Sequence, residues 1–187
     1  MERNFIVTLL LSASKKALER EEKLARIDFL TGVANARSFF ELANLEINRA
    51  RRYRHSFTIA YIDIDKFKAV NDDYGHLAGD SLLRLVGDAL RESLRSTDIV
   101  ARLGGDEFAI LLPEIDPEQS QVAISKVRDK LSSVIRSNNW KVTFSAGVIT
   151  FLKSPESVDE MLKKADNLMY SAKKSGRNRV KYEVFVE

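Results

Sequence analysis

Near the middle of the chain, two glycines stand between two apolar runs and are followed at once by two acids. The stretch is Arg102-Leu103-Gly104-Gly105-Asp106-Glu107-Phe108, and apolar residues continue to Leu112. Because glycine adopts positive φ without a Cβ clash, Gly104-Gly105 is a favoured two-residue hairpin turn. A bare exposed turn explains the glycines, but it does not explain two carboxylates placed directly before an apolar strand. The pattern therefore favours a metal and phosphate site, where glycines let a ligand approach the backbone.

The composition narrows the cations and partners that such a site can use. The 187 residues are 44% hydrophobic and 30% charged, which is typical of one globular domain with a short extension. The chain has no cysteine and only two histidines, so a bound cation is expected to be hard and held by carboxylates. The formal net charge of +3 does not indicate nucleic-acid binding. The longest early apolar run is too short to span a bilayer, so we expect no membrane segment and a cytoplasmic location.

Residues 1–27 carry an apolar stripe at heptad spacing, which predicts one helix. The stripe consists of Ile6, Leu10, Ala13, Ala17, Leu24 and Ile27. Two interpretations stay open for this segment. It is either an amphipathic helix that lies on its own domain, or a coiled-coil stalk that pairs with a second copy or continues from an upstream sensor.

Residues 28–187 are predicted to form a separate domain in which helices alternate with strands. Periodicity predicts helices over residues 35–53, 77–95, 118–137 and 157–174. It predicts strands over residues 57–64, 98–103, 107–112, 142–151 and 180–186. This order predicts an α+β domain like the palm of nucleotide polymerases and nucleotidyl cyclases, with helices covering a sheet that contains antiparallel strands.

The first predicted strand of this domain is apolar on both faces and ends in Asp63-Ile64-Asp65. Residues i and i+2 of a strand share a face, so both carboxylates can point the same way. A single acid here is best explained as a strand end in a solvated loop. Two acids that close so apolar a strand need a counter-charge if they are buried. Together with Asp106 on a neighbouring strand, they can hold divalent cations.

The segment after that strand, residues 66–76, is predicted as a polar loop dense in side chains that can bind a polar ligand. Asn71 offers a donor and an acceptor, Asp80 offers two acceptors, and Lys68 offers positive charge for phosphate. A helix–loop–helix corner with Asn71 and Asp80 as caps is the structural alternative. The cations that follow the last helix, residues 173–179, either match the helix dipole or bind phosphate. Gly176 is a candidate helix C-cap, and Gly147 within a strand indicates a bulge or a close backbone approach.

Together these motifs resemble the diguanylate cyclase family. Residues 104–108 match the GGDEF signature letter for letter, and the resemblance covers residues 28–187. It implies a polymerase-palm and nucleotidyl-cyclase-like α+β fold with a ferredoxin-like core, in which helices flank a mainly antiparallel sheet. Four further motifs stand in the family's order and spacing: Asp28-Phe29-Leu30-Thr31-Gly32 with Asn35, Asp63-Ile64-Asp65-Lys66-Phe67-Lys68 with Asn71-Asp72, Gly75-His76 with Gly79-Asp80, and Ala172-Lys173 with Gly176-Arg177-Asn178.

The resemblance implies an enzyme that condenses two GTP molecules into cyclic di-GMP and releases two pyrophosphates. It implies two Mg²⁺ per site, with Mn²⁺ as the alternative ion, bound by Asp63, Asp106 and the Ile64 carbonyl. Asp106, Glu107 and Lys68 are the implied catalytic residues. Asp80 would accept hydrogen bonds from guanine N1–H and its exocyclic amine, which adenine lacks. The implied substrate-binding residues are Phe67, Asn71, Asp80, Gly104, Gly105, Lys173 and Arg177.

The resemblance also implies a homodimer, because each domain presents one GTP, and a site for inhibition by the product. The inhibition site would be Arg95 and Asp98, an Arg-x-x-Asp motif five residues before the first signature glycine. Arg can bind the Hoogsteen edge of guanine through two hydrogen bonds, and Asp can accept from the Watson–Crick donors. A helix-end Arg paired with a nearby Asp is the structural alternative. Val33 and Ala36 depart from the usual family pattern, which leaves the role of those two positions open here.

Two other classes of function compete with this interpretation. A catalytically inactive domain that senses GTP or cyclic di-GMP is one, although inactive relatives typically lose the signature acids or the guanine pair. Another palm-type nucleotidyl cyclase or polymerase is the second. The complete signature and Asp80 argue against both alternatives.

Overall fold

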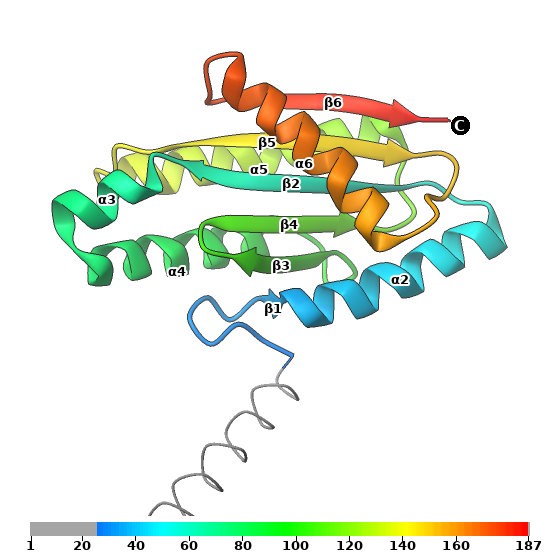
Figure 1. Cartoon of the computed structure of the whole chain (residues 1–187), viewed down its shortest axis with the longest axis horizontal. Coiled ribbons are helices and arrows are strands. Elements are labelled where there is room, and N and C mark those ends of the chain that lie inside the picture. The colour runs from blue at the N-terminus through cyan, green and yellow to red at the C-terminus, as the bar shows by residue number, and fades with distance from the viewer. Residues whose placement is uncertain (1–25, 187) are drawn as a thin grey trace, which may run out of the picture.

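A six-stranded mixed sheet is the centre of the computed structural model, which describes residues 26–186 (Figure 1). Its strands lie in the order β1-β3-β4-β2-β5-β6. The strands are β1 (Ala34–Asn35), β2 (Phe57–Asp65), β3 (Ile99–Gly104), β4 (Glu107–Leu112), β5 (Thr143–Phe151) and β6 (Val180–Phe185). The helices are α2 (Ala36–Tyr53), α3 (Phe67–Tyr74), α4 (His76–Ser93), α5 (Pro117–Ser137) and α6 (Val158–Lys174).

The four middle strands are all paired antiparallel, and the two outer strands are paired parallel to their neighbours. β2 lies between β4 and β5, and β3 pairs with β4. β1 adds to β3 and β6 adds to β5. With α3 and α4 between β2 and β3, and α5 between β4 and β5, the middle of the sheet has the β-α-β-β-α-β topology of ferredoxin-like folds. The predicted α+β fold with a mainly antiparallel sheet is confirmed.

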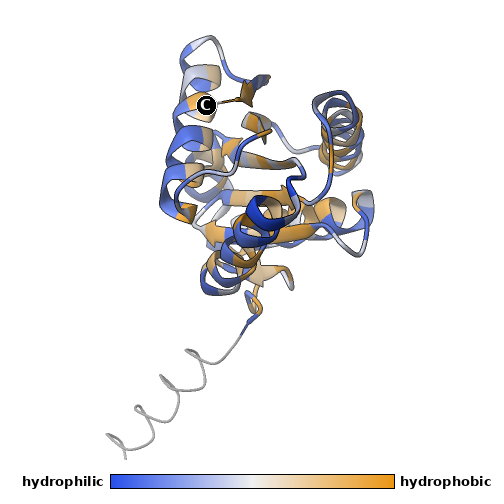
Figure 2. Cartoon of the chain, turned by 90° about the vertical axis from the view of Figure 1, so that its right-hand side faces the viewer, coloured by the Kyte–Doolittle hydropathy of each residue, from blue (hydrophilic) through white to orange (hydrophobic). Residues whose placement is uncertain are grey.

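Helices cover both faces of the sheet, and each face has its own apolar core. Side chains alternate along a strand, so the even-numbered residues of β2, such as Ile62, pack in one core with α4 and α5. The odd-numbered residues, such as Ile59, pack in the other core with α2 and α6. Figure 2 shows the hydrophobic colour on the strands and the hydrophilic colour on the outer helix surfaces. Asp63 and Asp65 are odd-numbered, so both point toward the α2 and α6 face.

Most predicted element ends agree with the structure because local capping groups are present. The Asn35 side chain accepts a hydrogen bond from Ser38 N at the start of α2, and Ser157 caps α6 through Glu160 N. At the end of α6, Gly176 N donates to the Lys173 carbonyl and Arg177 N donates to the Ala172 carbonyl. These two bonds form a Schellman motif, as the candidate C-cap at Gly176 predicts.

Gly147 of β5 marks a close approach of α6 to the sheet, which is one of the two predicted explanations. A Cβ at this position would collide with the Ala165 carbonyl and the Met169 amide of α6. The pairing of β5 with β2 continues through Gly147 without a register shift, so the residue is not a bulge. Glycine here lets the α6 backbone pack directly on β5.

Two parts of the predicted organisation are wrong. The segment predicted as a polar loop contains the helix α3, which ends one residue before Gly75. The predicted first helix does not reach residue 27, because Ile27 forms a bridge with Ala34 and the Arg26 carbonyl accepts from Asn35 N. The rest of that predicted helix lies outside the described residues. Within residues 26–186, none of the helices combines the length and apolar character needed to cross a membrane.

Candidate active site

The signature residues form the turn between β3 and β4, but the turn begins one residue later than predicted. Gly104 is the last residue of β3 and pairs with Glu107, while Gly105 and Asp106 form the turn. Of the two glycines, Gly105 has positive φ, at 48°. The prediction that Gly104-Gly105 occupies the two turn positions is therefore wrong. A register shift between Arg102 and Gly104 places Gly104 within the strand pairing.

Backbone and side-chain contacts hold this turn against both neighbours of β4. The Arg102 side chain donates to the Gly105 carbonyl from Nε at 2.9 Å and from Nη2 at 2.7 Å. On the other side, Ile64 N donates to the Asp106 carbonyl at 3.3 Å. Asp106 is therefore attached to the end of β2, directly beside Asp63. The two acids implied as metal ligands therefore lie side by side, Asp63 near the end of β2 and Asp106 in the turn before β4.

Asp63 is a buried carboxylate that faces other negative charges. It pairs with Glu107 across the β2–β4 register and is 5% exposed. The Lys173 ammonium, from the last turn of α6, lies 2.6 Å from its Oδ2. Burial raises the pKa of Asp63 to about 6; the negative charges of Asp106 and Glu107 contribute to that rise, while Lys173 opposes it. Lys173 alone does not compensate the negative charge gathered here.

Asp65 lies on the same face as Asp63, as the i and i+2 spacing predicts, but it has different partners. Its carboxylate accepts hydrogen bonds from Thr143 Oγ1 at 2.7 Å and Ser145 Oγ at 2.8 Å. It also accepts from Asn178 N at 3.0 Å, and Arg177 Nε lies 3.9 Å away. These contacts hold the segment after α6 against the sheet. Asp65 therefore fixes Arg177 and Asn178 at this end of the domain instead of joining the acidic cluster.

The residues implied for guanine lie on α3 and α4, at the same end of the sheet as the signature turn (Figure 1). Asn71 of α3 and Asp80 of α4 are half-buried, and Lys68 is exposed. The two helices pack closely enough that a Cβ on Gly79 would meet Asn71 Oδ1 and the Phe67 ring. The Asn71 amide therefore lies against α4 one residue from Asp80, and Phe67 lies beside it.

The carboxylate oxygens at the signature turn suit a hard divalent cation whose remaining ligands are water and phosphate oxygens. Within residues 26–186, no cluster of three or more His, Asp or Glu side chains is already arranged to hold a metal ion. Mg²⁺ commonly uses only one or two carboxylates together with water and substrate phosphates. Asp63 and Asp106 supply carboxylate oxygens. Burial is the main cause of the raised pKa of Asp63, and the negative charges of Asp106 and Glu107 add to it, so a cation here would be held by a buried, negatively charged group. The residues present therefore fit the implied ion.

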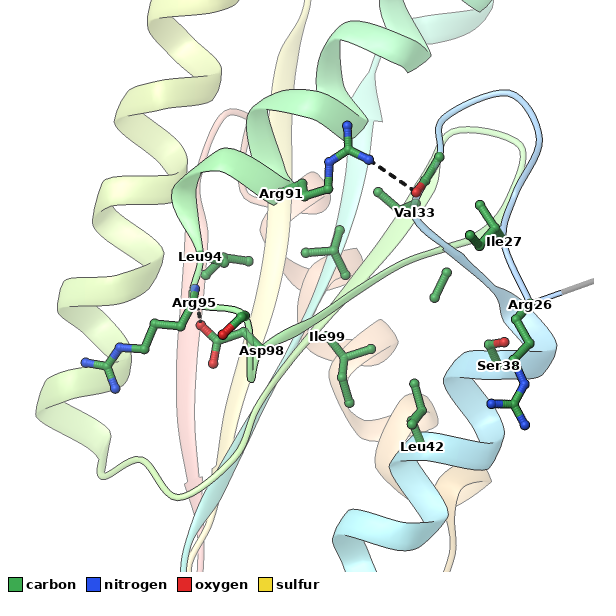
Figure 3. Close-up of a pocket in the computed structure, with 14 residues that line it drawn as sticks. Arg26, Ile27, Val33, Ser38, Leu42, Arg91, Leu94, Arg95, Asp98 and Ile99 are labelled. Carbon is green, nitrogen blue, oxygen red and sulfur yellow. Dashed lines mark hydrogen bonds between the residues drawn. The ribbon is translucent and has the colours of Figure 1, made fainter.

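Arg95 and Asp98 form a tight turn at the end of α4, with a cavity on each side. Arg95 N donates to Asp98 Oδ2 at 2.9 Å, and Asp98 N donates to the Arg95 carbonyl at 3.0 Å. The larger cavity, about 620 Å³, extends to β1 and α2 (Figure 3), and the smaller, about 290 Å³, extends to α5. The Arg95 guanidinium points away from the larger cavity (Figure 3). Asp98 binds the backbone of Arg95, so this is not the simple side-chain ion pair of the structural alternative.

Most of the domain, up to the start of β6, matches a protein-family model. The model described as "Diguanylate cyclase, GGDEF domain" matches residues 25–179. The chain belongs to the GGDEF diguanylate cyclase family. The resemblance inferred from the five motifs is thereby confirmed.

Individual GGDEF proteins agree with this assignment. Diguanylate cyclase DgcP of Pseudomonas aeruginosa is 35% identical over 166 residues, which cover 87% of this chain and 25% of DgcP. Probable diguanylate cyclase DgcT of Escherichia coli is 33% identical over 169 residues, covering 88% of this chain and 37% of DgcT. The chain thus spans well under half the length of these two relatives. The crystal structure of the coiled coil and GGDEF domain of DgcB from Caulobacter crescentus, in complex with c-di-GMP, has a TM-score of 0.78 at 29% identity, covering 96% of this chain and 97% of that chain.

The sequence analysis assigned no role to several residues that shape this GGDEF site. Arg102 binds the signature turn and also lies 3.3 Å from Asp28 Oδ1, which in turn accepts from Thr31 N and Oγ1. Burial raises the pKa of Asp28, but the hydrogen bonds from Thr31 and the charge of Arg102 outweigh it and lower this pKa below its ordinary value. Tyr61 lies two residues before Asp63. Burial raises its pKa above the ordinary value, and Glu107, Asp166 and Asp63 raise it further. An alternation argument along β2 could have placed Tyr61 on the Asp63 face, but no local signal indicates the Arg102 contacts.

Proposed function

We propose that this domain condenses two molecules of GTP into cyclic di-GMP and releases two molecules of pyrophosphate. The observation that carries the proposal is the buried Asp63, which faces Asp106 and Glu107 at the signature turn and has Lys173 at 2.6 Å. Membership of the GGDEF family and the names of DgcP and DgcT support the same reaction.

The acidic cluster is proposed to bind two Mg²⁺ ions, or Mn²⁺ in their place. Asp63, Asp106 and the Ile64 carbonyl would hold the ions, with Glu107 beside them. When bound with the triphosphate, such ions polarise the α-phosphate and neutralise the leaving pyrophosphate. Support for this assignment comes from the burial of Asp63 and from the negative charges of Asp106 and Glu107 beside it, which together raise its pKa, since a nearby cation stabilises the charged form of such a carboxylate.

The cationic and polar side chains of this chain are proposed to orient GTP. Lys173, paired with Asp63, and Arg177, held by Asp65, would meet phosphate charge, and Lys68 would do so from α3. Asn71 and Asp80 would bind the guanine edge, with Phe67 beside them. Asp80 would accept hydrogen bonds from guanine N1–H and from the guanine 2-amino group. Adenine has neither of these two donors, so ATP would leave the half-buried Asp80 carboxylate without partners.

In each half of the reaction, the 3′-oxygen of one GTP forms a bond to the α-phosphorus of the other. The bond from that phosphorus to the bridging oxygen of the β-phosphate breaks, and pyrophosphate leaves. The 3′-hydroxyl proton passes to the Asp106 carboxylate or to water. Since each domain presents one GTP, two domains must face each other, and the reaction then repeats in the opposite direction to close the ring.

Incubation of the purified chain with Mg²⁺ and either GTP or ATP, followed by identification of the products by mass spectrometry, tests the proposal. We expect cyclic di-GMP and pyrophosphate from GTP, and no cyclic product from ATP. The Asp63→Asn and Asp106→Asn variants should each lose more than about 99% of activity, as expected when a metal-binding carboxylate is removed. Binding of GTP without turnover by the intact chain would contradict the proposal and favour a sensing domain.

We also propose that Arg95 and Asp98 bind cyclic di-GMP and thereby inhibit the enzyme. The motif lies between two cavities, and its guanidinium is not used to pair with Asp98. Arg95→Ala should raise the concentration of added cyclic di-GMP needed for half-inhibition at least about tenfold, the loss expected when a bidentate contact is removed. Arg128→Ala is the control, since Arg128 is an exposed arginine paired with its neighbour Asp129. Unchanged inhibition of Arg95→Ala would count against this site.

A further inference from the structure

Tyr61 lies at the edge of the proposed active site, although neither the sequence motifs nor the proposed reaction uses it. It is in β2 two residues before Asp63, so the two side chains point to the same face. Its partners in the sheet register are Ala109 of β4 and Gly147 of β5. The α6 backbone packs directly on Gly147, so the Tyr61 ring has room on the other side, over the small Ala109 of β4. The side chain is half-buried.

Glu107 is the polar group that Tyr61 reaches across the sheet. Asp63 pairs with Glu107 and Tyr61 pairs with Ala109, so Tyr61 and Glu107 are diagonal neighbours on one face. Diagonal neighbours are within reach of aromatic and other long side chains. The Tyr61 hydroxyl is close enough to the Glu107 carboxylate for the negative charge of Glu107 to raise the pKa of Tyr61, after burial as the larger cause.

Without a restraint, the Glu107 side chain could turn away from Asp63 into a neighbouring cavity. A cavity of about 360 Å³ lies between α2 and α6, and both Tyr61 and Glu107 line it. Phe40 of α2 and Leu162 of α6 are among its apolar walls, and Asp166 of α6 is an acid on the same wall. A flexible glutamate can turn into such a space and leave the acidic cluster. Lys163 on the same wall would attract the Glu107 carboxylate into the cavity and Asp166 would repel it, so a hydrogen bond from the Tyr61 hydroxyl would decide where Glu107 lies.

We propose that Tyr61 is a positioning residue whose hydroxyl holds the Glu107 carboxylate beside Asp63 and Asp106, where Glu107 contributes to binding the divalent cation. The inference rests on the proposed function for its link to catalysis. It concerns residues of this chain, however, so it can be tested by ion binding as well as by turnover.

The test compares Tyr61→Phe with the wild type, since this change removes the hydroxyl and keeps the ring. We expect the Mg²⁺ concentration for half-activation to rise about fivefold and kcat to fall about fivefold, with the KM for GTP within about twofold at saturating Mg²⁺. Binding of Mn²⁺ in the presence of a non-hydrolysable GTP analogue, followed by electron paramagnetic resonance of the free ion, should weaken by a similar factor. If Tyr61 only supported the fold, Tyr61→Phe would not weaken ion binding selectively. A weaker ion affinity with an unchanged KM for GTP therefore indicates positioning.

Two comparisons make the result specific to the contact with Glu107. Tyr182→Phe removes the hydroxyl of an exposed tyrosine on β6, away from the acidic cluster, and should leave Mn²⁺ binding unchanged. In a Glu107→Gln background, Tyr61→Phe should have little further effect on Mn²⁺ binding, because coupled residues are not additive. Equal Mn²⁺ affinity of Tyr61→Phe and the wild type overturns the inference. A wild type that makes no cyclic di-GMP overturns the proposed function, and the Mn²⁺ comparison then still decides the role of Tyr61.

Discussion

At the scale of single residues, Asp63 shows how the requirements of folding and of the site oppose each other. A carboxylate that is 5% exposed is costly unless it is paired. Lys173 supplies one positive charge at 2.6 Å, but Asp106 and Glu107 add negative charge beside it. The site therefore carries an electrostatic cost in the absence of a cation. That cost should be measurable in the stability of the domain.

We expect Asp63→Asn to stabilise the metal-free domain at neutral pH. The folded pKa of Asp63 is raised from 3.8 to about 6, so between these values the folded domain keeps a proton that the unfolded chain has released. The contribution of Asp63 to stability is thus present near pH 4 and is lost as the pH rises to about 6. Each pKa unit corresponds to about 1.4 kcal/mol, and we expect about 1–2 kcal/mol after allowing for solvent screening.

Urea unfolding in EDTA between pH 4 and pH 8 measures this effect. The difference in the free energy of unfolding between Asp63→Asn and the wild type should widen up to about pH 6 and then stay constant. Asp65→Asn is the control, since Asp65 accepts three hydrogen bonds, and it should destabilise the domain. A difference that does not depend on pH would contradict the raised pKa.

At the scale of elements, Arg102 links the signature turn to the segment that precedes β1. One guanidinium donates to the Gly105 carbonyl twice and also lies beside Asp28. Asp28 in turn holds Thr31 in the turn before β1. The position of the signature turn therefore depends on a contact between β3 and residues far earlier in the chain.

Arg102→Lys should lower both stability and turnover, because lysine keeps the charge but cannot bind both partners with a planar fork. We expect a loss of about 1–2 kcal/mol in the free energy of unfolding and about a tenfold lower kcat from a displaced turn. Arg91→Lys is the matched control, since Arg91 is an exposed arginine that also contacts a backbone carbonyl and an acid. Wild-type stability and turnover of Arg102→Lys would show that the charge alone is sufficient.

The packing of α6 on β5 predicts a strong effect of Gly147→Ala. The added Cβ would meet the backbone of α6 at Ala165 and Met169, and displacing a packed helix costs about 1–3 kcal/mol. Because α6 carries Lys173, activity should also decrease. In Gly104→Ala, the added methyl group meets nothing within 4 Å, so its free energy of unfolding should stay within about 0.5 kcal/mol of the wild type. Equal stability of the two variants would rule out the close approach of α6.

At the scale of the whole molecule, four separate segments meet at one end of the sheet. The end of β2, the β3–β4 turn, the α3–α4 pair and the end of α6 supply the proposed site (Figure 1). These segments of one chain supply one proposed GTP site. The proposed reaction, which joins two GTP molecules, would therefore need a second copy of the domain to face the first.

Specific activity should consequently fall when the protein is diluted. If two domains associate reversibly, the rate of cyclic di-GMP formation rises with the square of protein concentration below the dissociation constant and linearly above it. The rate should be measured from nanomolar to micromolar protein at saturating GTP. Binding of a fluorescent GTP analogue should stay independent of dilution and serves as the control. Constant specific activity, together with a monomeric mass in solution, would exclude the requirement for two domains.

The sequence by itself determined the family, the order of most elements and the faces on which the acids lie. These properties follow from local rules: the period of a strand places Asp63 and Asp65 on one side, and capping groups set the start of α2 and α6. The signature and four spaced motifs identified the GGDEF family. The eight residues of α3 were missed because polar residues such as Asn71 weaken the helical pattern, and packing against α4 at Gly79 stabilises the helix instead.

Only the tertiary structure decided how these residues divide their roles. Asp63 and Asp65 are equivalent in the sequence pattern, yet Asp63 faces the signature turn while Asp65 binds hydroxyl groups of β5 and the segment after α6. The contacts of Tyr61 with Glu107 and of Arg102 with Asp28 depend on strand register and on helix packing. These contacts join residues that are far apart in the chain, and local periodicity carries no information about such contacts.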